Sequence, residues 1–380
     1  MMQSFKEQQV VDFINLIAIS GFFARAITGN ITFLFLGVLL GGGVFLYQYL
    51  DRLRLPYMAA ISLFIVTASY LFTFLNNGFS HGSLFIVLYV ACMGIAWRIS
   101  THGINYMFCW LFFYGSLAYF VVMLYVFNYS LESLFANSRN HISVYFINAA
   151  ALLYIAAMTT GRKISLIPAF IVLFVSVVSI GFGGIISALI FFILLAYHKL
   201  FYSFKGYKVI LFFVIVAVAE GLVIFWTDIV NYLSALPYVE GDMLVKLQSL
   251  HEVSGNARYH IWGEYFERLD ITRLLLGVSL SEEFYGFANL HSSYFLLHAR
   301  MGVLAFILMA LFLYMLLKIY RVNFVYFVCF LVLLLRGGTD TTFLAGSSFD
   351  FVLLYFFLFA YKSFRAPDRG SVNPSPLGDG

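Results

Sequence analysis

The sequence predicts an all-α membrane protein with about twelve spanning helices and one long loop on the outer side of the membrane. Of its 380 residues, 62% are apolar and only 11% are charged, and the mean hydropathy is +0.93. Soluble domains carry about 25% charged residues, so the excess apolar surface must face lipid. The apolar runs are long and lack period-two alternation. This indicates helices, which satisfy their own backbone groups within hydrocarbon.

Twelve apolar runs are candidate spanning helices, because a helix needs about 20 residues to cross a bilayer. The runs cover residues 10–27, 31–50, 57–75, 83–97, 104–127, 143–160, 164–180, 184–198, 208–227, 291–317, 322–335 and 348–361. The first run lacks a small-residue cleavage site, so we expect a retained helix and not a removed signal peptide. Residues 1–365 are expected to form a single transmembrane domain. Residues 366–380, rich in Pro, Gly and Ser, are expected to be a disordered cytoplasmic tail.

The distribution of Lys and Arg predicts that both termini are cytoplasmic. With the N-terminus inside, fourteen Lys and Arg residues lie on the cytoplasmic side. The opposite side has four outside its long loop, which are Arg25, Arg139, Arg300 and Arg336. Four more lie within that long loop, which the positive-inside rule discounts. Fourteen against four therefore places the long loop on the outer face.

This long outer loop, residues 228–290, lies between the ninth and tenth candidate spans. It holds nine of the eighteen acidic residues and has a soluble composition. We expect short amphipathic helices in it. Because long loops in compact proteins are usually functional or disordered, and this one has aromatic residues with helical periodicity, it is the expected active region.

Within the loop, Arg258, Trp262 and Tyr265 fall at positions i, i+4 and i+7, which is one face of a helix. Such a helix can lie along the membrane with its aromatic face toward lipid. Arg258 would then lie where a lipid diphosphate sits, and its planar guanidinium binds phosphate oxygens in pairs. The alternative is an interfacial helix whose Arg only extends to the headgroups.

A second cluster lies where the loop returns to the membrane, at Asn289–Tyr294. His291 can act as a general base, because an unperturbed His accepts a proton near neutral pH. His298 and Arg300 follow within the tenth run, and ionisable groups at such depth usually face a protein interior or a cavity. The alternative is a His that only caps or hydrogen-bonds locally.

Several function classes lose support. Lys and Arg are scattered singly, which argues against nucleic acid as a partner. Cys92, Cys109 and Cys329 all lie in apolar runs and lack metal-ligand spacing, so we expect small core residues. The chain has no P-loop and no HExxH sequence. We expect no metal and no cofactor.

The order of these features resembles the superfamily of O-antigen polymerases and O-antigen ligases, the Wzy and WaaL type membrane glycosyltransferases. Its members have a basic cytoplasmic loop, a span, a long periplasmic loop with an Arg and then a Trp, a Gly-containing turn, and a His-Asn-x-Tyr/Phe stretch before a Gly. The matching residues here are Lys199, Lys205 and Lys208; Arg258 and Trp262; Gly277; and His291, Tyr294 and Gly302. Ser292 stands where the family usually has Asn.

The resemblance implies glycan transfer from undecaprenyl diphosphate to an acceptor sugar at the periplasmic face of a bacterial inner membrane. It implies that His291 removes the acceptor proton and that Arg258 stabilises the leaving diphosphate. Candidates for a second phosphate-binding cation are Arg139, Arg300 and Arg336. Candidates for sugar or prenyl contacts are Trp262, Tyr265, Tyr294 and His298. The implied partners are the lipid-linked donor and acceptor, membrane lipid and a chain-length regulator protein.

Within this superfamily we favour a polymerase over a ligase, because polymerases tolerate more variation in these motifs. One alternative is a ligase that transfers the glycan to lipid A-core. An alternative from another class is a flippase or exporter of lipid-linked glycans, which would also have about twelve spans. A flippase predicts charges spread through many spans, whereas here the charges concentrate in the outer loop and in the helix that follows it.

Overall fold

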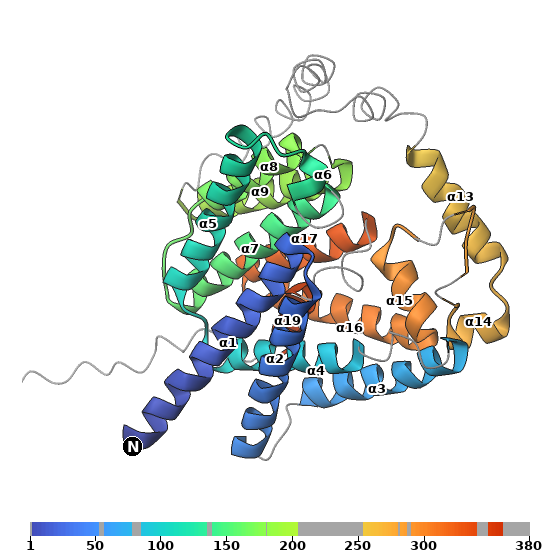
Figure 1. The fold of residues 1–380 in the computed structure, drawn as a ribbon, viewed down its shortest axis with the longest axis horizontal. Helices are drawn as coiled ribbons and strands as arrows, with labels where there is room; N and C mark the ends of the chain where they lie inside the picture. Colours follow the sequence, from blue (N-terminus) through green and yellow to red (C-terminus); the bar gives the residue numbers. More distant parts are fainter. Residues whose placement is uncertain are drawn as a thin grey trace, which may run out of the picture.

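A computed structural model describes residues 2–52, 57–77, 85–134, 139–179, 181–203, 254–279, 282–286, 290–339 and 349–359. Each regular element within these ranges is a helix, as predicted (Figure 1). The helices are α1 (Met2–Thr28), α2 (Ile31–Arg52), α3 (Tyr57–Asn77), α4 (Phe85–His102), α5 (Tyr106–Tyr125), α6 (Leu131–Leu134), α7 (Arg139–Thr159), α8 (Ile167–Val178), α9 (Phe182–Ser203), α13 (Ser254–Glu267), α14 (Ile271–Leu276), α15 (Ser293–Met301), α16 (Val303–Tyr320), α17 (Phe324–Thr339) and α19 (Phe349–Phe359).

The chain is a multi-pass membrane protein. Six helices, α1, α2, α5, α7, α9 and α16, are long and apolar enough to cross a membrane. Five shorter apolar helices lie within α3, α4, α8, α17 and α19. Eleven of the twelve candidate spans thus coincide with an apolar helix. The ninth candidate, residues 208–227, lies outside the described residues, as do residues 228–253 of the outer loop and the tail 366–380.

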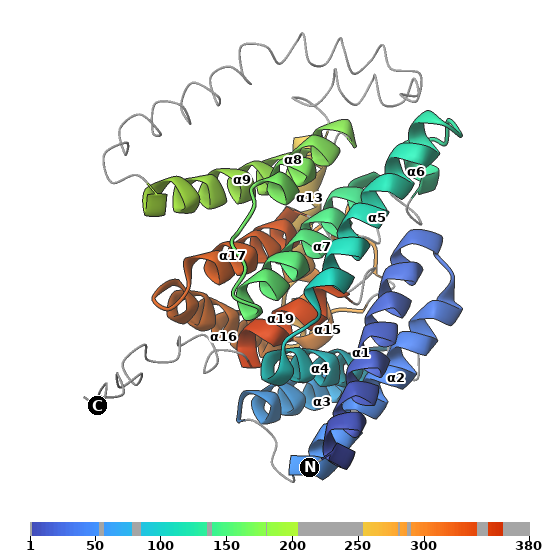
Figure 2. The ribbon, with the colours of Figure 1, turned by 90° about the vertical axis from the view of Figure 1, so that its left-hand side faces the viewer.

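Helix α7 is the centre of the bundle, with α5, α8, α9, α17 and α19 packed around it (Figure 2). Within its most apolar window, 89% is buried inside the protein, whereas the other five long helices bury 22–39%. A helix that is apolar on all sides is expected at such a place.

The three cysteines are free thiols and are buried, as their apolar surroundings predict.

An ion pair between a buried Arg and a half-exposed Asp joins the first and fourth helices. The Nε of Arg98 on α4 donates to Oδ1 of Asp12 on α1 at 2.7 Å, and a second guanidinium nitrogen donates to the carbonyl oxygen of Gln8 at 3.2 Å. Arg98 is only 2% exposed. Burying a guanidinium is costly unless it is paired and hydrogen-bonded, and both conditions hold here. Arg98 is thus a helix-packing residue and not a free loop cation.

The tenth candidate span, residues 291–317, is not one helix. It breaks at Gly302 into the nine-residue α15 and the 18-residue α16. Gly302 has a φ of +54°, and a Cβ at this position would clash with the carbonyl of Leu275 from the outer loop. Only glycine adopts such a backbone at low cost and allows so close a crossing. The prediction of a continuous tenth helix is therefore wrong, and only α16 has the length and apolarity of a span.

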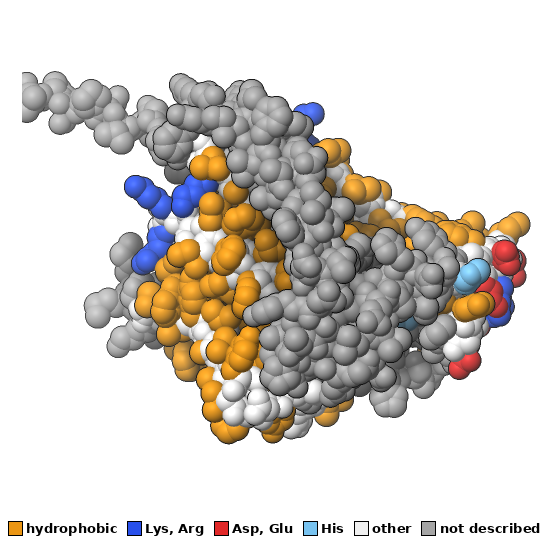
Figure 3. All heavy atoms as spheres, turned by 90° about the horizontal axis from the view of Figure 1, so that it is seen from above, with side chains coloured by type: hydrophobic (Ala, Val, Ile, Leu, Met, Phe, Trp, Pro, Cys, Tyr) orange, Lys and Arg blue, Asp and Glu red, His pale blue; other side chains and the backbone are white. Residues whose placement is uncertain are grey.

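Hydrophobic and charged side chains are unevenly distributed over the surface. Figure 3 shows hydrophobic side chains over the left and lower parts of the visible face, Lys and Arg side chains at its upper left and top, and acidic, basic and His side chains together at the right-hand end. Helices α13 and α14 lie toward that end (Figure 1). The acidic side chains on this face thus gather at the end where α13 and α14 lie.

Candidate functional site

Helix α13 packs through its buried side chains against other residues of this chain. Its buried side chains contribute to a small second core with residues of the loop and α15, made by Ile261, Tyr265, Val278, Phe284, Leu290 and Ala299. Tyr265 is 1% exposed, and its ring meets that of Phe295 at a centroid distance of 5.5 Å. The expected single aromatic face exists, but it lies toward α15 because Phe295 and its neighbours offer a matching apolar surface.

His298 of α15 joins the three helices α13, α14 and α15. Its Nδ1 lies 2.6 Å from the Tyr265 hydroxyl, and its Nε2 lies 3.1 Å from the carbonyl oxygen of Leu274. A carbonyl oxygen only accepts, so Nε2 carries the proton and Nδ1 accepts from the tyrosine. Both ring nitrogens are therefore engaged. This geometry makes His298 and Tyr265 residues that hold the three helices together.

Trp262 fixes the backbone immediately before His291. Its indole Nε1 donates to the carbonyl oxygen of Leu290 at 2.9 Å, and its ring lies 5.3 Å from the ring of Phe295. His291 itself is half-buried and has a φ of +48°. Non-glycine residues with positive φ are uncommon and often occur at functional sites. The His291 backbone is thus held in an unusual conformation by α13.

Two glycines make a close crossing behind this site. Gly277, which follows α14, has a φ of +93°, and a Cβ there would clash with the carbonyl of Ala299. The next residue, Val278, donates from its backbone N–H to that same carbonyl at 2.9 Å. Together with Gly302, Gly277 lets α14 approach the α15–α16 junction so closely that the two backbones are in contact.

Tyr294 ties α15 to α17. Its hydroxyl donates to the carbonyl oxygen of Leu334 at 2.6 Å, and its ring is 3.3 Å from where a Cβ on Gly338 would lie. Arg336 lies between these two contacts in the last turn of α17 and is 3% exposed. The candidate span 322–335 left Arg336 outside the helix, in an outer loop; this is wrong, since α17 continues to Thr339.

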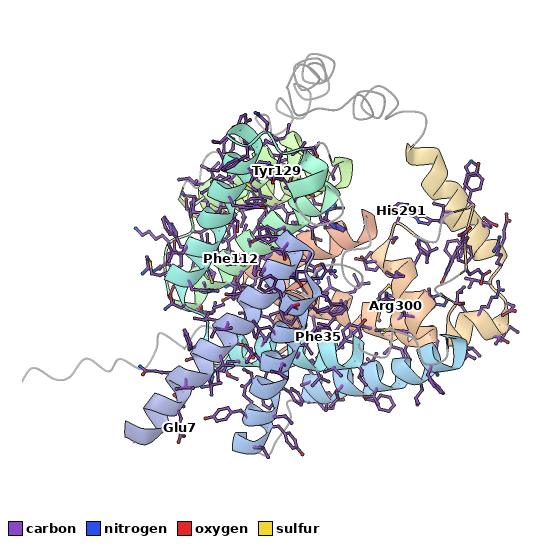
Figure 4. All side chains as sticks on the ribbon, in the orientation of Figure 1. Glu7, Phe35, Phe112, Tyr129, His291 and Arg300 are labelled. Carbon is purple, nitrogen blue, oxygen red and sulfur yellow. The ribbon has the colours of Figure 1, made fainter. Side chains whose placement is uncertain are left out.

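Arg300 lies on α15, and His291 lies just before that helix (Figure 4). The Arg300 guanidinium donates to the hydroxyl of Tyr89 on α4. The Tyr89 ring in turn lies 4.7 Å from the ring of Phe351 on α19. Arg300 therefore interacts with a tyrosine of the transmembrane bundle.

Sequence reasoning missed the polar group next to this contact. Asp350 of α19 is 1% exposed and accepts a hydrogen bond from the side-chain amide of Asn148 on α7. An acid within the apolar run 348–361 was a usable signal, because ionisable residues in membrane helices are functional candidates by default. Tyr89 had no such signal, since tyrosines are common throughout this chain, with 26 in all.

The remaining predicted residues are placed by their backbones. Arg258 lies on α13, one turn before Trp262, and Arg139 is the first residue of α7. Their side chains lie outside the described residues.

No family model and no curated protein sequence matches this chain. Of the predicted groups, His291 lies just before α15 and Arg300 lies in its last turn, and Tyr294 of α15 contacts the helix that carries Arg336. A half-buried His next to helices that carry guanidinium groups can accept a proton while a neighbouring anion is stabilised.

Proposed function

We propose that this protein polymerises undecaprenyl-diphosphate-linked oligosaccharide units into a surface polysaccharide such as O-antigen, at the periplasmic face of a bacterial inner membrane. The observation that carries the proposal is the bond from Trp262 to the Leu290 carbonyl. It connects the helix that bears Arg258 to the residue before His291. The two groups that the reaction needs thus lie on segments held together by one contact.

In this reaction an acceptor hydroxyl attacks the anomeric carbon of the donor glycan. A new carbon–oxygen bond forms to the acceptor, and the bond between the anomeric carbon and the diphosphate oxygen breaks. The acceptor proton passes to His291, and undecaprenyl diphosphate leaves as an anion that Arg258 stabilises. A positioned base contributes about 10²–10⁴ in rate, and donors aimed at developing charge contribute a similar factor.

The guanidinium groups of the half-buried Arg300 and the buried Arg336 supply the remaining charge. Arg300 is oriented by Tyr89, and Arg336 lies in the turn of α17 that Tyr294 contacts. We assign them to the diphosphate of the second lipid-linked substrate, since a polymerase must hold two such lipids at once. Arg suits this task because it stays charged when buried.

The test is a lipopolysaccharide gel of the source bacterium. A deletion strain is complemented with the wild type, His291→Ala or Arg258→Ala at equal protein levels. Matched controls are His198→Ala on α9 and Arg273→Ala on α14, which remove the same side-chain types elsewhere. We expect the deletion to leave core plus one repeat unit, both site variants to stay without a ladder, and both controls to restore it.

Other outcomes would assign another function. Loss of every repeat unit from the core, with polymer accumulating on the lipid carrier, would identify a ligase. Repeat units trapped on the cytoplasmic face would identify a flippase. An unchanged ladder in both site variants would refute the roles given to His291 and Arg258.

A further inference from the structure

An exposed aromatic pair lies on the outer loop, apart from the side of α13 that packs on α15. The rings of His260 on α13 and Tyr285 stack with centroids 5.0 Å apart and planes 19° from parallel. Both residues are exposed, Tyr285 by 56%. The pair therefore covers one face of the Tyr285 ring and leaves much of the residue open to solvent.

The fold holds this pair in place at a conformational cost. Tyr285 has a φ of +52°, and Gly286 follows with +74°. Positive φ is a genuine outlier for a bulky residue such as Tyr, and such strain persists only where the surroundings impose it. Phe284, directly before, is 2% exposed and packs on the ring of Tyr265 at 5.1 Å. The buried Phe284 thus anchors the turn that projects Tyr285 outward.

Charged side chains surround the base of the turn. The backbone N–H of Tyr285 donates to the carboxylate of Glu264, whose other oxygen pairs with Arg268. Arg268 also bonds Glu282 at 3.1 Å and the carbonyl oxygen of Glu283 at 3.1 Å. Ion pairs of this density are too costly to place in hydrocarbon, so the aromatic pair faces water and not lipid.

We propose that Tyr285, backed by His260, is a binding subsite for a sugar ring of the glycan chain. A flat ring beside half-buried carboxylates matches a pyranose, which has an apolar C–H face and a rim of hydroxyl donors. This inference rests on the proposed function for its choice of carbohydrate as ligand. The subsite would hold the glycan away from His291, on the far side of α13.

The test measures glycan binding without turnover. Full-length protein in nanodiscs is titrated calorimetrically with polysaccharide released from the source bacterium by mild acid, which carries no lipid. The variant Tyr285→Asn removes the ring and keeps a residue that tolerates positive φ, so the turn is retained. Tyr285→Phe keeps the ring, and Ile271→Ala removes another side chain of the same loop that is 78% exposed.

We expect Tyr285→Asn to weaken binding about tenfold and His260→Ala to weaken it severalfold, as loss of an aromatic contact predicts. Tyr285→Phe and Ile271→Ala should bind like the wild type. Equal binding by Tyr285→Asn, or no binding by the wild type, would overturn the subsite. His291→Ala should bind like the wild type as well. Normal ladders from His291→Ala, with Tyr285-dependent binding intact, would refute the catalytic role and leave the subsite standing.

Discussion

The indole Nε1 of Trp262 lies 2.9 Å from the carbonyl oxygen of Leu290, so a residue of the outer-loop helix holds the backbone that leads into His291. Trp262 and His291 are 29 residues apart in the sequence, yet one hydrogen bond joins their segments. The bond explains how a His in a positive-φ conformation keeps a fixed place beside α15. Trp262 therefore acts as a positioning residue for the proposed base.

The variant Trp262→Phe tests this role. It keeps an aromatic ring against Phe295 and removes the donor to Leu290. We expect kcat for elongation of lipid-linked repeat units to fall about tenfold or more with KM little changed, because small displacements of a catalytic group are costly. Trp110→Phe on α5, where Trp110 is 39% exposed, is the control. A rise in KM alone would show that Trp262 serves binding instead.

The variant Tyr265→Phe probes the attachment of α13. It removes the donor to His298 Nδ1 and leaves a buried acceptor without its bond, which costs roughly 1–3 kcal/mol. We expect a lower thermal midpoint in detergent and faster proteolysis within α13. Tyr57→Phe is the matched control, since Tyr57 is 78% exposed. Identical midpoints for both variants would mean that the Tyr265–His298 bond does not hold the loop.

The variant Gly302→Ala tests the crossing between α14 and the α15–α16 junction. The added Cβ meets the Leu275 carbonyl and forces a positive φ on an L-residue, so we expect a destabilisation well above 1 kcal/mol. Gly115→Ala on α5 adds the same methyl group where nothing lies within 4 Å. It should be neutral or stabilising, since Ala is the better helix former by about 1 kcal/mol. Thermal midpoints and protein yield in membranes measure the difference.

The variant Tyr89→Phe tests the orientation of Arg300. It removes the acceptor of the Arg300 bond and keeps the ring that packs on Phe351. If Arg300 contacts a substrate diphosphate, KM for the lipid-linked substrate should rise severalfold while kcat changes little. Tyr49→Phe on α2, with Tyr49 44% exposed, is the control. An unchanged KM would separate Arg300 from substrate binding.

The sequence was most informative about the membrane helices. The length of an apolar run can be read directly from the order of the residues. Eleven of the twelve runs contain a described apolar helix. The break in the tenth run was not predictable in the same way. Gly302 was visible, but its effect depends on Leu275 and Leu276, which are distant in sequence and meet it only in the fold.

The site was predicted in part for a related reason. Helical periodicity placed Trp262 and Tyr265 on one face, yet it carries no information on what covers that face. Here the cover is α15, which supplies His298 and Phe295. The Asn148–Asp350 bond was missed because it pairs helices α7 and α19 across 202 residues.

The enclosure of α7 has a consequence for the protein in membranes of different thickness. Perimeter helices such as α2, with 22% of its window buried, meet the acyl chains directly, whereas α7 hardly does so. Hydrophobic mismatch is usually relieved by tilting of lipid-facing helices. We expect such tilts to be absorbed at the perimeter while Asn148, and with it Asp350, keeps its depth. Activity should then vary little across bilayers of different acyl-chain length.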